Sequence, residues 1–172
     1  MIKEAFLLLV LAGVLALGIN LVHPNAVPYV GEYRELSGGD GPIVPPTAEE
    51  GDPPFIAIDV AQMEHAAGDA IFIDAREESE YVCGTIPGAI HIPFEYLPDG
   101  DLTSYLDSAL AGADRDKHLI TFCSGEECDL SLHLARLFND MGYTNVSIFF
   151  GGAREWENFD LEVERSPACE SY

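Results

Sequence analysis

The pattern of apolar and polar positions from residue 55 onward predicts strands and helices in alternation. Short apolar runs typical of buried strands occupy 55–60, 70–75, 89–93, 118–122 and 145–150. Helical patterns lie between these runs at 61–68, 76–84, 101–113 and 130–142. Such alternation favours an α/β fold in which helices flank a central parallel sheet.

The N-terminal segment has a different pattern. From Ala5 to Ile19 every position is apolar or glycine, which is close to the roughly 20 residues that one bilayer crossing needs. Lys3 precedes this run, and its small residues offer no cleavage site at the end of the run. We therefore expect an uncleaved signal anchor at 1–23, a transmembrane helix that leaves the rest of the chain outside the cytoplasm. The alternative is a buried core helix.

Composition divides the remainder into three parts. Residues 24–54 are rich in proline, glycine and acid, which is typical of a linker or of an arm that lies on a surface. The predicted domain spans 55–165, and 166–172 forms an acidic tail. The expected protein is a single-pass membrane protein with one extracytoplasmic domain.

Charge restricts the partners. The 172 residues include 30 acidic and 8 basic side chains, for a formal charge of -22. That charge argues against nucleic-acid binding and against attraction to anionic lipid surfaces. It suits either a salty environment or a basic partner.

Cys123 is the first candidate for chemistry. In "ITFCSGEECDLS" it follows the predicted strand 118–122 and precedes a loop that leads into a helix. Ligands of open α/β sheets bind at such strand ends, where loop N–H groups and the helix N-terminus stabilise a thiolate or a bound anion. The alternative is a buried structural cysteine.

Several motifs together resemble the rhodanese-like (sulfurtransferase) domain family. They are "FIDAREESEY", "GTIPGAIHIP", the cysteine loop, "MGYTNVSIFFGG" and Trp156 after "GGARE". The resemblance covers about 55–164 and implies a single-domain member with a central parallel sheet. It also implies that Cys123 accepts sulfane sulfur from a donor and becomes a persulfide.

The same resemblance gives roles to neighbouring residues. Asp74 and Arg76 would keep the surroundings of the loop together. From its place between strand and helix, the substrate-binding loop is expected to comprise Ser124, Gly125, Glu126 and Glu127. From the residues alone, Asp74 ends a buried strand and needs a partner, for which Arg76 is the nearest candidate.

The loop departs from the family pattern because it carries no Arg or Lys. Carboxylates at Glu126 and Glu127 would raise the pKa of Cys123 and repel thiosulfate. A neutral or protein-borne persulfide is therefore the expected sulfur donor. The alternative is that both glutamates face water beside the helix N-terminus. Thr85 also replaces the histidine that is usual in "GTIPG".

Cys128 follows Cys123 by five positions, close enough for a disulfide if the loop bends suitably. Cys128 would then act as a resolving thiol, or it packs under the helix as a small apolar side chain. The spacing is a weak metal signal, so neither a metal nor a cofactor is expected. The pairing of Cys83 and Cys169 stays open.

Two functions remain. The first is a membrane-anchored sulfurtransferase or persulfide handler whose partner is a small sulfur donor or a protein thiol or persulfide. The second is a non-catalytic binding or redox-sensing module with a Cys123–Cys128 disulfide.

Overall fold

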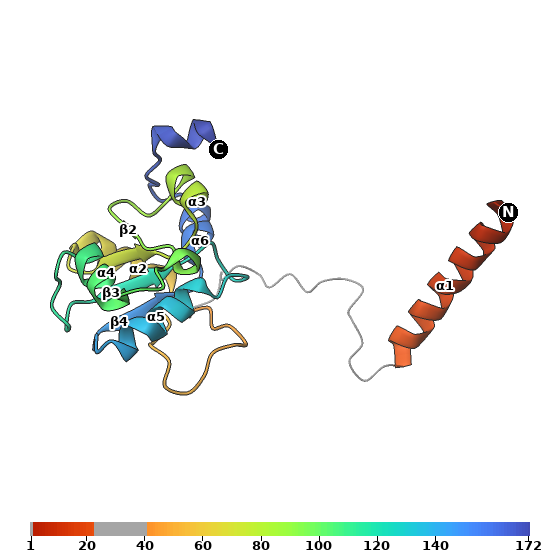
Figure 1. Ribbon diagram of the computed structural model, residues 1–172, viewed down its shortest axis with the longest axis horizontal. Helices are drawn as coiled ribbons and strands as arrows, with labels where there is room; N and C mark the ends of the chain where they lie inside the picture. The colour runs from red at the N-terminus through yellow and green to blue at the C-terminus, as the bar shows by residue number, and fades with distance from the viewer. Residues whose placement is uncertain (1, 23–40) are drawn as a thin grey trace. The chain divides into compact units, whose positions relative to one another are not determined.

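The computed structural model describes residues 2–22 and 41–172 (Figure 1). The chain divides into two compact units, Met1–Arg34 and Glu35–Tyr172. The described part of the first unit is the helix α1 (Ile2–Val22), which contains the apolar segment. No helix formed by the described residues is long and apolar enough to cross a membrane. The anchor at 1–23 stays a prediction, and residues 24–40 of the predicted linker lie outside the described residues.

The second unit is built on a parallel sheet, as the alternating pattern predicts. Its strands run in the order β2-β1-β3-β4, and each pairs in parallel with its neighbour. The strands are β1 (Ile71–Asp74), β2 (Ile90–His91), β3 (Leu119–Phe122) and β4 (Val146–Phe149). All four lie within apolar runs of the sequence, so the central parallel sheet is confirmed.

Helices cover both faces of this sheet. Alternate strand residues point to opposite faces, so Ile73 and Phe72 enter two different hydrophobic clusters. The Ile73 cluster includes residues of α4 (Leu102–Ala109) and α5 (Leu130–Asp140). The Phe72 cluster includes residues of α2 (Ile58–Ala67) and α6 (Gly152–Asn158). The domain therefore has three layers with a core on each side of the sheet.

The prediction of a strand at 55–60 is wrong. Phe55 makes a single parallel bridge to Ile148, and α2 begins three residues later at Ile58. Ile58 and Ala61 are three positions apart and both are buried, which fits a helix packed on the sheet. A short apolar run does not by itself distinguish a strand from a buried helical turn.

The arm before α2 packs on the domain from residue 41 onward. Ile43 packs against the core cluster, and Arg136 of α5 donates to Asp52 over 2.6 Å from Nε to Oδ1 and 2.8 Å from Nη2 to Oδ2. The hydrogen bond from Arg136 lowers the pKa of Asp52 below its ordinary value. Residues 41–54 therefore include a surface-bound part of the segment that was predicted as a linker.

The C-terminal segment is joined to α3 (Glu78–Cys83). Cys83 forms a disulfide with Cys169 of the short helix η2 (Pro167–Ser171), and Figure 1 shows the two helices side by side. The Ser166 N–H also donates to the Val82 carbonyl over 2.8 Å. The structure thus resolves the pairing that the sequence left open.

Removing this disulfide is expected to destabilise the domain. The bond closes a loop across 86 positions, and a loop of that size predicts a loss of about 4 kcal/mol in the free energy of unfolding. Urea unfolding of the Cys83→Ser/Cys169→Ser variant, compared with the wild type without reductant, measures this loss. Equal midpoints for the two proteins would contradict the prediction. Unfolding in a strong reductant is the control, because the wild type then loses the same bond.

Candidate functional site

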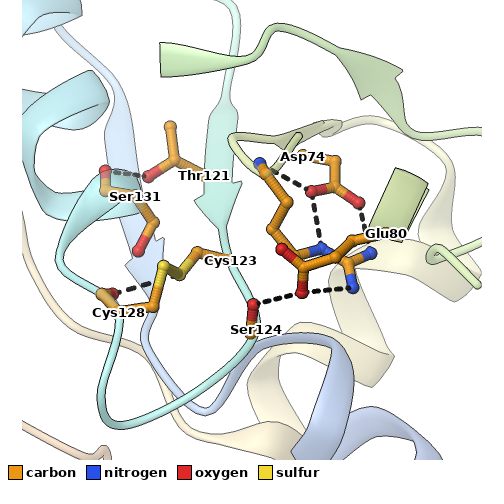
Figure 2. The surroundings of a disulfide bond; sticks show 8 residues. Asp74, Glu80, Thr121, Cys123, Ser124, Cys128 and Ser131 are labelled. Atoms are coloured by element: carbon orange, nitrogen blue, oxygen red, sulfur yellow. Dashed lines mark hydrogen bonds and ion pairs between the residues drawn. A yellow bond between two sulfur atoms is a disulfide. The ribbon is translucent and has the colours of Figure 1, made fainter. Parts of the chain in front are cut away.

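Cys123 follows β3 directly, at the sheet edge where the strands end. Its side chain is 1% exposed and forms a disulfide with Cys128, as Figure 2 shows. Cys128 immediately precedes Asp129, the N-cap residue of α5. The Asp129 side chain makes no capping hydrogen bond. The structure brings both predicted cysteines together at the start of α5.

The loop backbone turns between the two cysteines. The Cys128 N–H donates to the Gly125 carbonyl over 3.0 Å, so this amide serves the turn. The Cys128 carbonyl oxygen lies 3.1 Å from the Cys123 sulfur. The sequence analysis predicted N–H donors around the Cys123 sulfur. In the disulfide form, however, this nearby carbonyl oxygen is a hydrogen-bond acceptor. After reduction the Cys123 thiol can donate to that carbonyl.

The start of α6 supports the loop from the other side. The Ala153 N–H donates to the Cys123 carbonyl over 2.9 Å, and the Arg154 N–H donates to the Ser124 carbonyl over 3.1 Å. Gly152 has a φ of 62°, and a Cβ there would overlap the Cys123 carbonyl. The glycine at position 152 of "FFGG" thus permits the close approach of two backbones.

Replacing Gly152 by alanine is expected to disrupt this contact. Positive φ and overlap with a backbone carbonyl together predict a loss of about 3 kcal/mol in the free energy of unfolding. Thermal or urea unfolding measures the loss. Gly88→Ala is the matched control, since Gly88 has a φ of 75° but open space around its Cβ position. Equal losses in the two variants would show that the close approach is unimportant.

Asp74 and Arg76 form a buried ion pair at the end of β1. Arg76 donates to Asp74 over 2.9 Å from Nε to Oδ1 and over 2.6 Å from Nη2 to Oδ2. Asp74 is fully buried and Arg76 is 6% exposed. The Thr85 hydroxyl also donates to Asp74 Oδ2 over 2.8 Å. Thr85, which replaces the usual histidine, is therefore part of this network.

A chain of polar contacts joins this ion pair to the cysteine loop. Arg76 Nη1 lies 3.8 Å from Glu80 Oε1, and the Ser124 hydroxyl donates to the same oxygen over 2.7 Å (Figure 2). Glu80 thus lies between Arg76 and the loop. No pattern in the sequence indicates this role, because Glu80 is one of three glutamates in "REESE".

His91 and Tyr81 border the same region. The His91 ring stacks on Tyr81 with centroids 4.4 Å apart, and its Nε2 donates to the Arg76 carbonyl over 2.9 Å. Burial raises the pKa of Tyr81, and the negative charges of Glu164 and Asp74 raise it further. Tyr81 therefore stays neutral at physiological pH.

A cavity of about 280 Å³ lies beside the loop. Its lining includes Ser124, two arginines and two glutamates: Arg76, Arg154, Glu80 and Glu157. Glu126 and Glu127 of the predicted substrate loop are not among its lining residues, and Glu127 is exposed. Sequence reasoning missed Arg154, because it lies on α6 and far from the loop in sequence. The loop lacks a cation, whereas the cavity has two.

Ser131 is a second residue that the sequence did not single out. It is 1% exposed, and its hydroxyl has no hydrogen-bond partner among the described residues. In Figure 2 this hydroxyl points toward the two sulfurs. Its carbonyl accepts from the Thr121 hydroxyl over 2.9 Å, which fixes the first turn of α5. A serine at the start of a predicted helix is too common a pattern to identify as a site residue from sequence.

No metal-binding site is visible among the residues that the structure describes. Within residues 2–22 and 41–172, no group of three or more His, Cys, Asp or Glu side chains is arranged to bind a metal ion. The expected absence of a metal stays a prediction.

A strand-end cysteine loop braced by a buried Asp–Arg pair agrees with the comparison to known families. The model of the rhodanese-like domain matches residues 58–159, which is more than half of the chain. The chain belongs to the rhodanese-like domain family. The match extends from the first residue of α2 to just beyond α6, so it includes the whole sheet and the cysteine loop.

Relatives of this rhodanese-like domain include sulfurtransferases. The human thiosulfate:glutathione sulfurtransferase is 34% identical over 97 residues, 53% of this chain and 82% of its own. An HTH-type transcriptional regulator of Mycobacterium tuberculosis is 32% identical over 98 residues, 57% of this chain but only 39% of its own. The chain therefore matches well under half of that regulator.

Solved structures agree with the family. A human single-domain sulfurtransferase has a TM-score of 0.52 at 26% identity and covers 61% of this chain and 96% of its own. A Bacillus halodurans protein has a TM-score of 0.53 at 25% identity, over 63% of this chain and 74% of its own. The match thus spans nearly the whole of the human protein (96%) and a smaller share of the Bacillus halodurans protein (74%).

Proposed function

We propose that this rhodanese-like domain is a sulfurtransferase or persulfide handler that transfers sulfane sulfur through Cys123. The single observation that carries the proposal is the position of Cys123, at the end of β3 in a loop that starts α5 and is backed by α6. The Cys123 sulfur is bonded to Cys128, the residue before the N-cap of α5, and a nearby helix N-terminus favours the thiolate, which is the nucleophilic form.

The proposed reaction begins from the reduced pair. The Cys123 thiolate attacks the outer sulfur of a persulfide donor, forms a new sulfur–sulfur bond and releases the donor thiolate. The outer sulfur then leaves to an acceptor thiolate, which restores the Cys123 thiolate. No net oxidation occurs in this cycle, since one persulfide is exchanged for another.

Cys128 is proposed to resolve the persulfide when no acceptor arrives. Its thiolate attacks the inner sulfur, which is the Cys123 Sγ, and the outer sulfur leaves as hydrosulfide. The product is the Cys123–Cys128 disulfide, the form of the pair described above. A dithiol reductant must then reduce this bond before the next cycle.

The donor is proposed to be a neutral or protein-borne persulfide. The cavity beside the loop has two arginines and two glutamates, so its formal charges cancel. The adjacent Glu126 and Glu127 add negative charge to the loop, which disfavours the doubly charged thiosulfate. The human relative is named for thiosulfate and glutathione, so thiosulfate belongs in the test beside a persulfide.

A redox-sensing or binding module is the second candidate function. The Cys123–Cys128 disulfide favours it, because the bond occupies the thiol of a residue that is only 1% exposed. In this case the pair switches between dithiol and disulfide without carrying sulfur. The chain, with its formal net charge of -22, would then bind a basic partner.

The intact mass of the full chain separates the two functions. The protein is reduced, freed of reductant, and treated with either a low-molecular-weight persulfide or thiosulfate. A gain of one sulfur, assigned to Cys123 by peptide mapping, supports the transferase. Resolution by Cys128 also ends in a loss of two hydrogens, so the measurement is followed over time and repeated with Cys128→Ser. Absence of a sulfur adduct at every time in both proteins supports the redox module and contradicts the transferase. Uptake from thiosulfate as fast as from the persulfide would contradict the proposed donor class.

The proposed location is an oxidising compartment outside the cytoplasm, with 1–23 as the anchor. The Cys83–Cys169 disulfide supports this proposal, because structural disulfides persist mainly in such compartments. Thiol alkylation in intact cells before lysis, followed by mass measurement, tests it. Complete alkylation of Cys83 and Cys169 would contradict an oxidising location, and recovery of the protein without membranes would contradict the anchor.

A further inference from the structure

Another cavity, of about 530 Å³, lies on the side of β1 away from the cysteine loop's strand. Its lining comes from the start of α3, the end of β2, and more distant segments of the chain. Since α3 follows β1, these residues lie at the carboxyl edge of the β1–β2 pair. A cavity of this size accommodates a small organic ligand or one long side chain.

Tyrosines form much of the wall. Tyr96 ends η1 (Phe94–Tyr96), Tyr105 lies on α4, and Tyr172 follows η2. Their exposed fractions are 67%, 36% and 69%, so considerable ring surface is open to solvent. Three separate elements thus contribute aromatic surface to one cavity. The negative face of such a ring attracts a cation.

The charges at the cavity are negative. Glu77 and Glu78 line it and are exposed, and no Lys or Arg is among its lining residues. The Ser79 hydroxyl donates to Glu77 Oε1 over 2.7 Å, while Glu78 makes no ion pair within the described part of the chain. His91 also lines the cavity, but its Nε2 is already engaged by the Arg76 carbonyl.

We propose that this cavity binds an organic cation, a guanidinium or ammonium group, between the tyrosine rings and the carboxylates of Glu77 and Glu78. The rings supply cation–π attraction and apolar contact for the stem of the ligand. The two carboxylates supply the opposite charge and accept hydrogen bonds from the N–H groups. An anion would meet two negative charges, and a purely apolar ligand would leave the carboxylates desolvated without partners.

Tyr172 makes this site dependent on the Cys83–Cys169 disulfide. Tyr172 lies three residues after Cys169, and its N–H donates to the Cys169 carbonyl over 3.3 Å. Cys169 is bonded to Cys83 at the end of α3, the helix whose first turn includes Glu78. The disulfide therefore keeps one aromatic wall beside the acidic wall. This site is separate from the Cys123 chemistry and does not depend on it.

Calorimetric titration of the full chain tests the proposal. The probe is N-acetyl-arginine amide, and N-acetyl-citrulline amide is its neutral counterpart of nearly equal shape. We expect a Kd on the order of 1 mM for the arginine derivative, and at least about 10-fold weaker binding of the citrulline derivative. Equal binding of the two compounds would overturn the proposal.

Paired variants separate a local site from the general acidity of the chain. Glu77→Gln/Glu78→Gln is expected to weaken arginine binding by about 10-fold, as loss of two charge-assisted contacts predicts. Asp116→Asn/Asp140→Asn is the control, because it removes the same charge from exposed positions that do not line the cavity. Equal weakening in both variants would overturn the proposal.

The aromatic walls are tested separately. Tyr96→Leu keeps an apolar side chain but removes the ring, and we expect about 5-fold weaker binding. Cys83→Ser/Cys169→Ser should weaken binding to a similar degree if Tyr172 contributes a wall. Unchanged affinity in Tyr96→Leu would overturn cation–π recognition.

A nine-residue glycine-serine peptide with one central arginine identifies the source of the cation. Tighter binding than the amide supports a peptide ligand, and equal binding supports a free cation.

Discussion

Replacing Cys123 by serine is expected to abolish sulfur uptake by the protein. A serine hydroxyl is not ionised near neutral pH, so the variant lacks the thiolate that must attack the donor. We expect no sulfur adduct in the intact mass and a loss of at least about 1,000-fold in transfer to an acceptor thiol, the scale of losing an essential nucleophile. Unchanged transfer by the variant would contradict the assignment of Cys123 as the nucleophile.

Cys128→Ser is the informative companion variant. It keeps the nucleophile and removes the proposed resolving thiol, so the persulfide on Cys123 should persist longer than in the wild type. The measurement is the decay of the sulfur adduct with time, together with release of hydrosulfide. Loss of all uptake in Cys128→Ser would show that Cys128 is required before resolution. Identical decay in the two proteins would contradict a resolving role for Cys128.

Asp74→Asn is expected to destabilise the domain strongly. The substitution leaves the buried Arg76 guanidinium without its carboxylate, and breaking a buried ion pair typically costs about 4 kcal/mol. Chemical unfolding at neutral pH measures the change in the free energy of unfolding. Because Glu80 links Arg76 to Ser124, we also expect slower reaction of Cys123 with a thiol reagent or persulfide donor after reduction.

Thr85→Val is the matched control for Asp74→Asn. It removes one hydrogen bond to Asp74 but keeps the ion pair and nearly the same volume, so the expected loss is about 1 kcal/mol. Equal losses in the two variants would contradict the dominance of the ion pair. A normal Cys123 reactivity in a folded Asp74→Asn protein would contradict the proposed link from the ion pair to the loop.

The fold could be predicted because its signals are local. Runs such as 118–122 and 145–150 are short, apolar and separated by helical patterns, which is what a parallel sheet covered on both faces requires. The segment 55–60 shows the limit of this reasoning. Its apolar residues fit a strand or a buried helical turn equally well, and the sheet leaves only Phe55 a bridging partner.

The candidate site was predictable only in part. The strand-end position of Cys123 and the pairing of Asp74 with Arg76 follow from neighbours close in sequence. One of the two cations that line the cavity beside the loop, Arg154, comes from α6, about 30 positions after Cys123. No local pattern connects these two segments, because their contact depends on how α6 packs against the cysteine loop.

The sequence by itself determined the four strands of the sheet, most of the helices around them, the family resemblance and the position of Cys123 after a strand. These features depend on periodicity and on motifs that each lie within a few residues. Only the tertiary structure decided that Cys83 pairs with Cys169, that Thr85 completes the Asp74 network, and that three tyrosines meet at one cavity. Each of these contacts joins side chains from separate elements, whose distances are set by packing of the whole domain.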